Sequence, residues 1–251
     1  MITKEYPYLY ETHLHTMHGS KCGKNSGREM VDAAKAAGYT GIFITEHNWG
    51  GNTIVDKKLP WEQWVAAFIQ GYYETRDYGD SVGIDVFWGY EAGFCGTEFL
   101  IYGFDPHWLF QHPQLRELPL KEHLALVRAE GGMVIHAHPF RTASYIPSIQ
   151  LLPFDVDGVE GINGGHQQVA SGGTPPVYRD TLAIHYANAY GLPLTAGSDV
   201  HSTNLKGCGV AFRRKLTSAK DYCTAIKNNE DRVLVNGTQV YDRFGNLLEE
   251  K

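Results

Sequence analysis

The chain has 251 residues, of which 43% are hydrophobic, and it carries a formal net charge of −6 at pH 7. A chain of this length and composition can form one large domain with a sizeable apolar core. The negative charge and the absence of a long Lys/Arg run argue against binding to long nucleic acid, because that affinity is largely electrostatic. A small phosphorylated substrate, neutralised by metal ions in a cleft, is compatible with the composition.

The sequence shows no targeting signal. Residues 1–7 lack the apolar core of a signal peptide, and no apolar stretch approaches the ~20 residues needed to cross a bilayer. The four cysteines, Cys22, Cys95, Cys208 and Cys223, form no Cys-x-x-Cys pair and no disulfide framework. We therefore expect a soluble cytoplasmic protein without a membrane partner.

The first predicted strand, residues 9–12, leads directly into His13-Leu14-His15-Thr16. Side chains alternate along a strand, so His13 and His15 point to the same face, ~7 Å apart. Two imidazoles so placed can converge on one cation. A single His-x-His at a strand end is at least as often an ordinary polar pair, so its meaning depends on the rest of the chain.

Strand-like and helix-like segments then alternate. Ser26 is the predicted N-cap of a helix over 28–37, and residues 41–45 form the continuous apolar run of a parallel strand covered on both faces. The polar loop 49–60 is a candidate substrate loop, and the aromatic stripe of the helix 61–78 indicates core packing. Further helices are expected at 120–130, 177–190 and 218–228, strands at 84–90, 99–104, 133–135, 156–159 and 192–196, and a hairpin at 232–241.

This alternation predicts an α/β fold of the (β/α) barrel type, with the site at the C-terminal rim of the strands. An open doubly wound sheet is the alternative. The Gly-rich phosphate turn that usually follows the first strand of such a sheet is missing here.

Most predicted strands end in, or begin beside, a potential metal ligand. These residues are His13, His15, His47, Glu91, Glu98, His136, His138, Asp199 and His201. A single ion cannot use so many ligands, and unpaired buried carboxylates would be costly, so the set predicts several cations. Mixed imidazole and carboxylate ligands suit Zn, Mn or Fe. Metal ions ~3.5–4 Å apart activate water and stabilise both oxygens of a displacement at phosphorus.

Five segments resemble the PHP (polymerase and histidinol phosphatase) family, in the family's order and over nearly the whole chain. They are His13-Leu14-His15-Thr16, Ile44-Thr45-Glu46-His47, Gly89-Tyr90-Glu91, Ala137-His138-Pro139-Phe140 and Gly197-Ser198-Asp199-Val200-His201-Ser202. The resemblance implies a distorted (β/α)7 TIM-like barrel, here a single domain over residues 1–251, with a trinuclear metal site. It also implies phosphoesterase activity through a metal-bridging hydroxide.

The resemblance also implies a distribution of ligands over the ions. His13, His15, Glu91 and Asp199 would hold one metal, and Glu91 would bridge to a second one held by His138. The third would be held by His47 and His201.

Two positions depart from the commonest family pattern. Glu98 stands where many members have His, and a ligand position after His-x-His-Thr offers His18 or Cys22. Cys22 is either a thiolate ligand or an ordinary loop thiol, and His18 could instead contact substrate.

Arg141 is the candidate phosphate clamp, because a guanidinium offers paired donors to phosphate oxygens. Together with Asp199 and His201 it forms the set expected to act in catalysis. We interpret Arg213-Arg214-Lys215 as a solvated charged run and His136 as a structural histidine, while His166 could be a ligand or a bystander.

The predicted function is metal-dependent hydrolysis of a small phosphorylated substrate, with a phosphomonoester favoured over a diester. An amidohydrolase-type metal hydrolase is one alternative, although that family generally bridges its metals with a lysine or its carbamate, and the matching strand end offers Glu91. A non-catalytic, metal-stabilised module that binds ligands or partners is the other.

Overall fold

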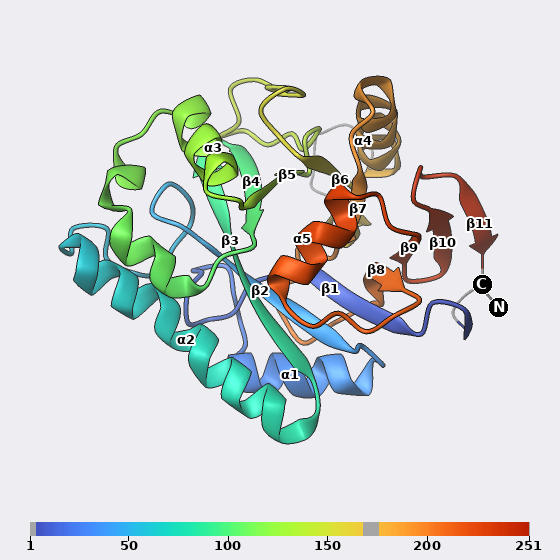
Figure 1. The fold of residues 1–251 in the computed structure, drawn as a ribbon, viewed down its shortest axis with the longest axis horizontal. Helices are drawn as coiled ribbons and strands as arrows, with labels where there is room; N and C mark the ends of the chain where they lie inside the picture. The colour runs from blue at the N-terminus through green and yellow to red at the C-terminus, as the bar shows by residue number, and fades with distance from the viewer. Residues whose placement is uncertain (1–3, 168–175, 251) are drawn as a thin grey trace.

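The computed structural model describes residues 4–167 and 176–250. Its eleven strands form one mixed sheet in the order β11-β10-β9-β8-β1-β2-β3-β4-β5-β6-β7 (Figure 1). The strands are β1 Tyr8–Leu14, β2 Gly41–His47, β3 Asp85–Phe94, β4 Thr97–Tyr102, β5 Met133–Ala137, β6 Gly158–Asn163, β7 Leu194–Gly197, β8 Cys208–Phe212, β9 Arg232–Asn236, β10 Gln239–Asp242 and β11 Leu247–Glu250.

Five α-helices and three short 3-10 helices connect these strands within the described residues. They are α1 Gly27–Ala36, α2 Trp61–Val82, α3 Leu120–Ala129, α4 Pro176–Tyr190 and α5 Ala219–Lys227, with 3-10 turns at Pro106–Gln111, Pro113–Arg116 and Gly164–Gln167. None of these helices is both long enough and apolar enough to cross a membrane.

Local signals place several elements as predicted. Ser26 caps α1 through a capping box, in which its side chain accepts from Glu29 N–H and the Glu29 side chain accepts from Ser26 N–H. The hairpin expected at 232–241 is formed by β9 and β10. Strands β8 and β11 and the full length of α2 were not expected.

The two faces of the sheet bury different side chains. Ile42 and Ile44 of β2 pack with Met30 and Val31 of α1 on one face. Phe43 of β2 points to the other face, where its ring packs against that of Tyr222 on α5, with centroids 4.7 Å apart. Helix α5 therefore fills the inside of the curled sheet, while α1 and α2 cover its outside (Figure 1).

The sheet curls until the ends of β1 and β7 meet. Leu14 and Val200 form a parallel bridge, with His15 N–H donating to Val200 O at 3.0 Å and Val200 N–H donating to His13 O at 3.2 Å. This junction brings the His-x-His segment beside the segment that carries Asp199.

The predicted (β/α)7 barrel is not confirmed, and the fold is a mixed α/β fold with a curled, half-barrel sheet. β3 and β4 form an antiparallel hairpin, β4 also pairs antiparallel with β5, and β8 to β11 are antiparallel. The β3–β4 turn places Cys95 at φ 50° and Gly96 at φ 90°, which is typical of a tight hairpin turn. Because the turn is so short, no helix separates the two strands.

Candidate metal centre

One rim of the sheet collects the ligand-type residues predicted from the sequence. β1, β2 and β3 are parallel, so their carboxyl ends lie together. The hairpin turn returns Glu98 to the same edge, opposite Gly93 of β3 and Ala137 of β5. Among the described residues, four groups of three side chains each bring their potential ligand atoms within 4.8 Å of one another. These groups are His15–Cys22–His47, His13–Glu91–His138, His13–His15–Asp199 and His47–Glu91–Glu98.

Glu91 lies in the middle of these groups and is almost fully buried. Its Oε1 is 3.1 Å from His138 Nε2 and 3.4 Å from His13 Nε2. Its Oε2 is 2.8 Å from His47 Nδ1 and 3.4 Å from His15 Nε2. Each oxygen therefore faces two imidazole nitrogens, as expected of a carboxylate that bridges two cations.

Asp199 approaches the same imidazoles from the end of β7. Its Oδ1 is 3.4–3.5 Å from the Nε2 atoms of His13, His15 and His201. The residue has φ 49°, in the left-handed region that Asp tolerates better than most residues. The left-handed conformation turns the chain sharply just after β7, so that Asp199 and His201 both reach the rim.

Hydrogen bonds at the outer ring nitrogens determine which lone pairs face the centre. His13 Nδ1 lies 2.9 Å from Glu160 Oε1, so Nδ1 carries the hydrogen. Ser20 donates its hydroxyl to Glu46 Oε2 at 2.6 Å and therefore accepts from His15 Nδ1 at 3.1 Å. With both imidazoles neutral, the two Nε2 atoms, 3.2 Å apart, direct lone pairs at each other.

Two buried atoms of the centre also lack hydrogen-bond partners. His47 Nδ1 and Glu91 Oε2 are 2.8 Å apart as an ion pair, in a geometry that is not that of a hydrogen bond. Buried groups that face one another without well-formed hydrogen bonds are unfavourable, and a cation bound between them removes that cost. The residues present therefore fit bound metal ions.

The pKa values of the two imidazoles from the first strand shift in opposite directions. Burial lowers the pKa of His15 to about 3, with His47 adding to the effect. Burial also lowers the pKa of His13, but Glu160, Asp199 and Glu91 overcome this and raise it well above the ordinary value. The carboxylates that raise the pKa of His13 are the negative charge that bound cations would neutralise.

Cys22 joins the centre, and His18 does not. Burial raises the pKa of the Cys22 thiol, but hydrogen bonds with His201 and His47 bring it down to about 7. His18 is exposed and lies beside α2, where its Cβ would be 2.5 Å from a Cβ placed on Gly71. Of the two residues between which the sequence left the choice open, only Cys22 is close to His15 and His47.

Glu98 and Arg141 form an ion pair at the edge of the centre. Arg141 Nη2 contacts Glu98 Oε2, and Arg141 Nη1 is 3.9 Å from Asp199 Oδ2. Glu98 also lies 3.8 Å from His47 Nδ1 and 3.7 Å from His138 Nε2. Burial and the nearby Glu91 raise the pKa of Glu98, while Arg141 opposes the shift.

His136 does not join the centre. It is buried against the Phe99 ring, with centroids 4.9 Å apart, and burial lowers its pKa to about 3. This agrees with the structural role expected for it. The side chain of His166 lies outside the described part of the chain.

Sequence reasoning missed the residues behind the ligands, namely Glu160, Ser20, Glu46 and Glu11. Glu160 also accepts from His138 N–H at 3.0 Å. Glu11 accepts from the N–H groups of His13 and Ser198 at 2.9 and 2.8 Å. Two of these residues could have been found from the sequence, because Glu46 lies within one of the PHP-like segments and Glu160 lies at a predicted strand end.

A cavity of about 620 Å³ opens over the centre. Its walls include His47, Glu98 and Arg141, together with residues 50–52 of the loop predicted to meet substrate. The cavity gives a small molecule access to the ligand residues, and Arg141 lies in its wall.

Comparison with known proteins gives similarity in fold only. No protein-family model and no curated protein sequence matches the chain. A two-domain protein from Bacteroides vulgatus, described as containing a predicted PHP-like metal-dependent phosphoesterase, has 15% identity and a TM-score of 0.68 over 93% of this chain. The chain spans 66% of that protein, just under two thirds of its length.

Two further structures cover most of both chains. PsfC from Pseudomonas syringae has 18% identity and a TM-score of 0.60, over 88% of this chain and 89% of its own. A putative metal-dependent phosphoesterase from Bifidobacterium adolescentis has 16% identity and a TM-score of 0.54, over 86% and 94%. The resemblance to the PHP family seen in the sequence thus extends to the fold.

Proposed function

We propose that this chain is a metal-dependent phosphoesterase of the PHP type that hydrolyses a small phosphorylated substrate. The observation that carries the proposal is the convergence of lone pairs from His13, His15, Glu91 and Asp199 on one buried point beside a cavity. Phosphoesterase activity is also ascribed to the Bacteroides and Bifidobacterium proteins that share the fold. The chain's own residues supply the rest of the argument.

The ligand residues divide into three sets, for two to three ions of Zn, Mn or Fe. His13, His15, Glu91 and Asp199 would hold one ion, and Glu91, Glu98 and His138 a second. The third would take His47, His201 and Cys22. When bound, such ions activate a water molecule for attack and withdraw charge from the phosphoryl oxygens.

The protein's own contribution is orientation. Glu160 and the Ser20–Glu46 pair hold the two imidazoles of the first strand in the tautomer that presents Nε2 to the centre. Arg141 offers two guanidinium nitrogens to the cavity side of the centre, where they can bind phosphoryl oxygens as a fork. In this arrangement Arg141 exchanges part of its contact with Glu98 for contact with substrate.

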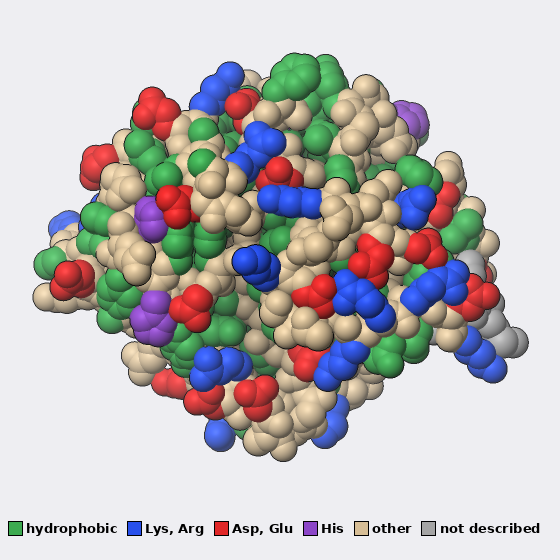
Figure 2. All heavy atoms as spheres, viewed as in Figure 1, with side chains coloured by type: hydrophobic (Ala, Val, Ile, Leu, Met, Phe, Trp, Pro, Cys, Tyr) green, Lys and Arg blue, Asp and Glu red, His purple; other side chains and the backbone are tan. Residues whose placement is uncertain are grey.

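The amidohydrolase alternative is disfavoured by the central residue. Glu91 lies where four imidazoles converge, so a glutamate occupies the central position for which the amidohydrolase family generally uses a lysine or its carbamate. A non-catalytic module that binds ligands would also have such a cavity, so the substrate panel below decides between these two readings. The net charge of −6 favours small monoesters over nucleic acid, and Figure 2 shows one face on which basic and acidic side chains are interspersed.

The test is a substrate panel on protein purified with its metals retained. The panel contains phosphomonoesters, phosphodiesters, single-stranded DNA and RNA, and cyclic amides. We expect phosphate release from small monoesters, abolished by chelation and by Glu91→Gln. Hydrolysis of amides alone, or of nucleic acid in preference to small esters, would contradict the proposal.

A further inference from the structure

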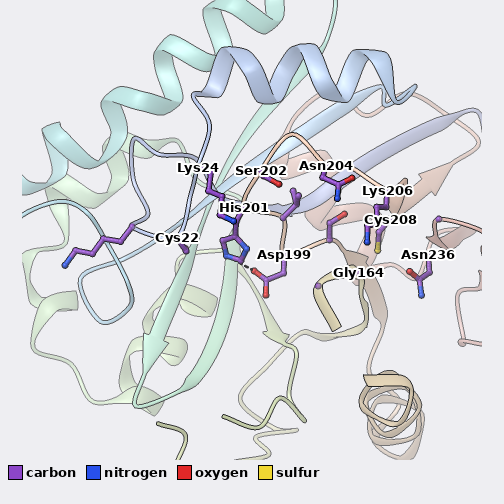
Figure 3. Close-up of a pocket in the computed structure, with 15 residues that line it drawn as sticks. Cys22, Lys24, Gly164, Asp199, His201, Ser202, Asn204, Lys206, Cys208 and Asn236 are labelled. Atoms are coloured by element: carbon purple, nitrogen blue, oxygen red, sulfur yellow. Dashed lines mark ion pairs between the residues drawn. The ribbon is translucent and has the colours of Figure 1, made fainter. Parts of the chain in front are cut away.

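A second cavity, of about 480 Å³, lies on the other side of Asp199 and His201. Its lining includes those two residues, Cys22, and the three lysines Lys21, Lys24 and Lys206. In Figure 3, Asp199 and His201 lie beside Cys22, and Lys206 and Asn236 lie at the end of the row farthest from it. The cavity therefore begins at the proposed metal centre and extends away from it.

The lining carries more positive than negative charge. Asp199 is its one carboxylate among the described residues. No ion pair joins any of the three lysines to a carboxylate in the part of the chain that the structure describes, whereas Arg213, Arg214 and Lys215 each contact one within 3.0 Å. In a chain of net charge −6, three such lysines around one cavity leave a local excess of positive charge.

Backbone hydrogen bonds hold the loops that carry these lysines. Lys24 N–H donates to His201 O at 2.8 Å, which ties the first loop to the end of the proposed ligand set. Gly237 N–H donates to Gly207 O at 3.3 Å, next to Lys206. Ser202 and Asn204 add hydroxyl and amide groups to the lining. The loop that carries Lys24 is thus tied to the centre, and the segment that carries Lys206 is tied to the turn between β9 and β10.

We infer that this cavity binds a second anionic group of the substrate, so that the preferred substrate is a phosphomonoester whose leaving group carries a phosphate or a carboxylate. The inference rests on the proposed function, because it concerns the leaving group in the same reaction. The reacting phosphoryl group lies at the metal centre, and the second anion reaches Lys24 and Lys206. Lysine suits this task, since its ammonium group is a mobile point charge that accepts anions of different shapes.

The experiment compares matched substrates and matched variants. Alkanediol bisphosphates of increasing length are each paired with the alkyl phosphate of the same length, and 4-carboxyphenyl phosphate is paired with phenyl phosphate. The enzymes are the wild type, the double variant Lys24→Gln/Lys206→Gln, and Lys220→Gln as a control in α5, away from the cavity.

For the wild type, we expect kcat/KM for the best doubly anionic substrate to exceed that of its partner by about tenfold or more, mostly through KM. The double variant should lose most of this preference, while its activity on simple alkyl phosphates and that of the control stay unchanged. A gain with the bisphosphates identifies a phosphate as the second anion, and a gain with 4-carboxyphenyl phosphate identifies a carboxylate. Equal kcat/KM within every pair, or a preference that survives in the double variant, overturns the inference but not the proposed function.

If no phosphate ester is hydrolysed, a binding measurement can still test the anion site independently of the proposed function. That outcome contradicts the proposed function, and calorimetric titration of an alkanediol bisphosphate into the metal-free protein then tests the cavity alone. Binding that the double variant weakens supports an anion site. Binding that is absent, or equal in the wild type and the double variant, overturns it.

Discussion

Two regions of this molecule gather charged side chains in opposite ways. Beside α5, Arg214 contacts Asp221 at 2.7 Å and Glu230 at 2.8 Å, with the arginine 42% exposed. At the rim of the sheet, His13, His15 and Glu91 are almost completely buried, and their facing atoms are 3.2–3.4 Å apart. In the first region a guanidinium donates hydrogens to carboxylates, and in the second imidazole nitrogens and carboxylate oxygens face one another around a common point.

The difference separates stability from function. An exposed ion pair, in which an arginine donates hydrogen bonds to carboxylates, adds only a modest amount to stability, because water competes for both charges. A buried set of facing acceptors is unfavourable on its own and becomes favourable when cations bind. We therefore expect changes at the rim to act on metal binding and activity, and changes beside α5 to act on unfolding alone.

The largest expected effect follows removal of the metals. Elemental analysis should find two to three transition-metal ions per chain, and chelation should abolish phosphoesterase activity. Restoring Mn or Zn at about a hundred times the dissociation constant should raise the melting temperature by roughly 5–10 °C. At most one ion per chain after reconstitution would contradict the trinuclear assignment.

The next effect is that of Asp199. Asp199→Asn keeps a side chain that tolerates φ 49° but removes the carboxylate charge from the centre, and should lower kcat by at least ~100-fold. Circular dichroism should be unchanged, and metal should raise the melting temperature less than in the wild type. Asp221→Asn is the matched control, the same change in the exposed region, and should keep full activity. A well-folded Asp199→Asn protein with normal turnover would remove Asp199 from the site.

Substitutions of Glu98 test whether this residue is a metal ligand or only the ion-pair partner of Arg141. Glu98→Ala should lower metal occupancy and rate together, by about 10–100-fold, since it removes an oxygen ligand and frees Arg141. Glu98→His should keep the metal and shift the preferred ion from Mn or Fe toward Zn. Normal occupancy with a reduced rate in Glu98→Ala would mean that Glu98 only positions Arg141.

The smallest effect is that of Asp221 on stability. Arg214 lowers the pKa of Asp221 to about 2, against a smaller opposing effect of burial, and Thr217 N–H adds to the lowering. Because the folded pKa lies below the unfolded one, this stabilisation is present above pH ~4 and is lost as the pH falls toward 2. Asp221→Asn should cost about 1 kcal/mol at neutral pH, discounted because Arg214 is exposed. Denaturant unfolding of the metal-free proteins should show the difference between variant and wild type shrinking over that range. If the difference in unfolding free energy instead stays constant with pH, the stabilisation comes from hydrogen bonds that do not need the Asp221 charge.

Local features of the sequence determined much of this structure. The cap of α1 at Ser26, the apolar run of β2 and the hairpin of β9 and β10 depend on neighbouring residues, so periodicity and turn chemistry suffice to predict them. The convergence of ligands at one rim also follows from the sequence, because the polar residues come at the ends of predicted strands whose carboxyl ends share an edge.

The tertiary structure alone decided how the rim is completed. The Cys95–Gly96 turn makes β4 antiparallel to β3, and it brings Glu98 to Arg141. That Cys22, and not His18, lies close to His15 and His47 depends on how the loop after β1 packs beside α2. Glu160 reaches His13 across 147 residues of chain. Contacts between residues so distant in sequence depend on the packing of the whole chain, and no local pattern encodes them.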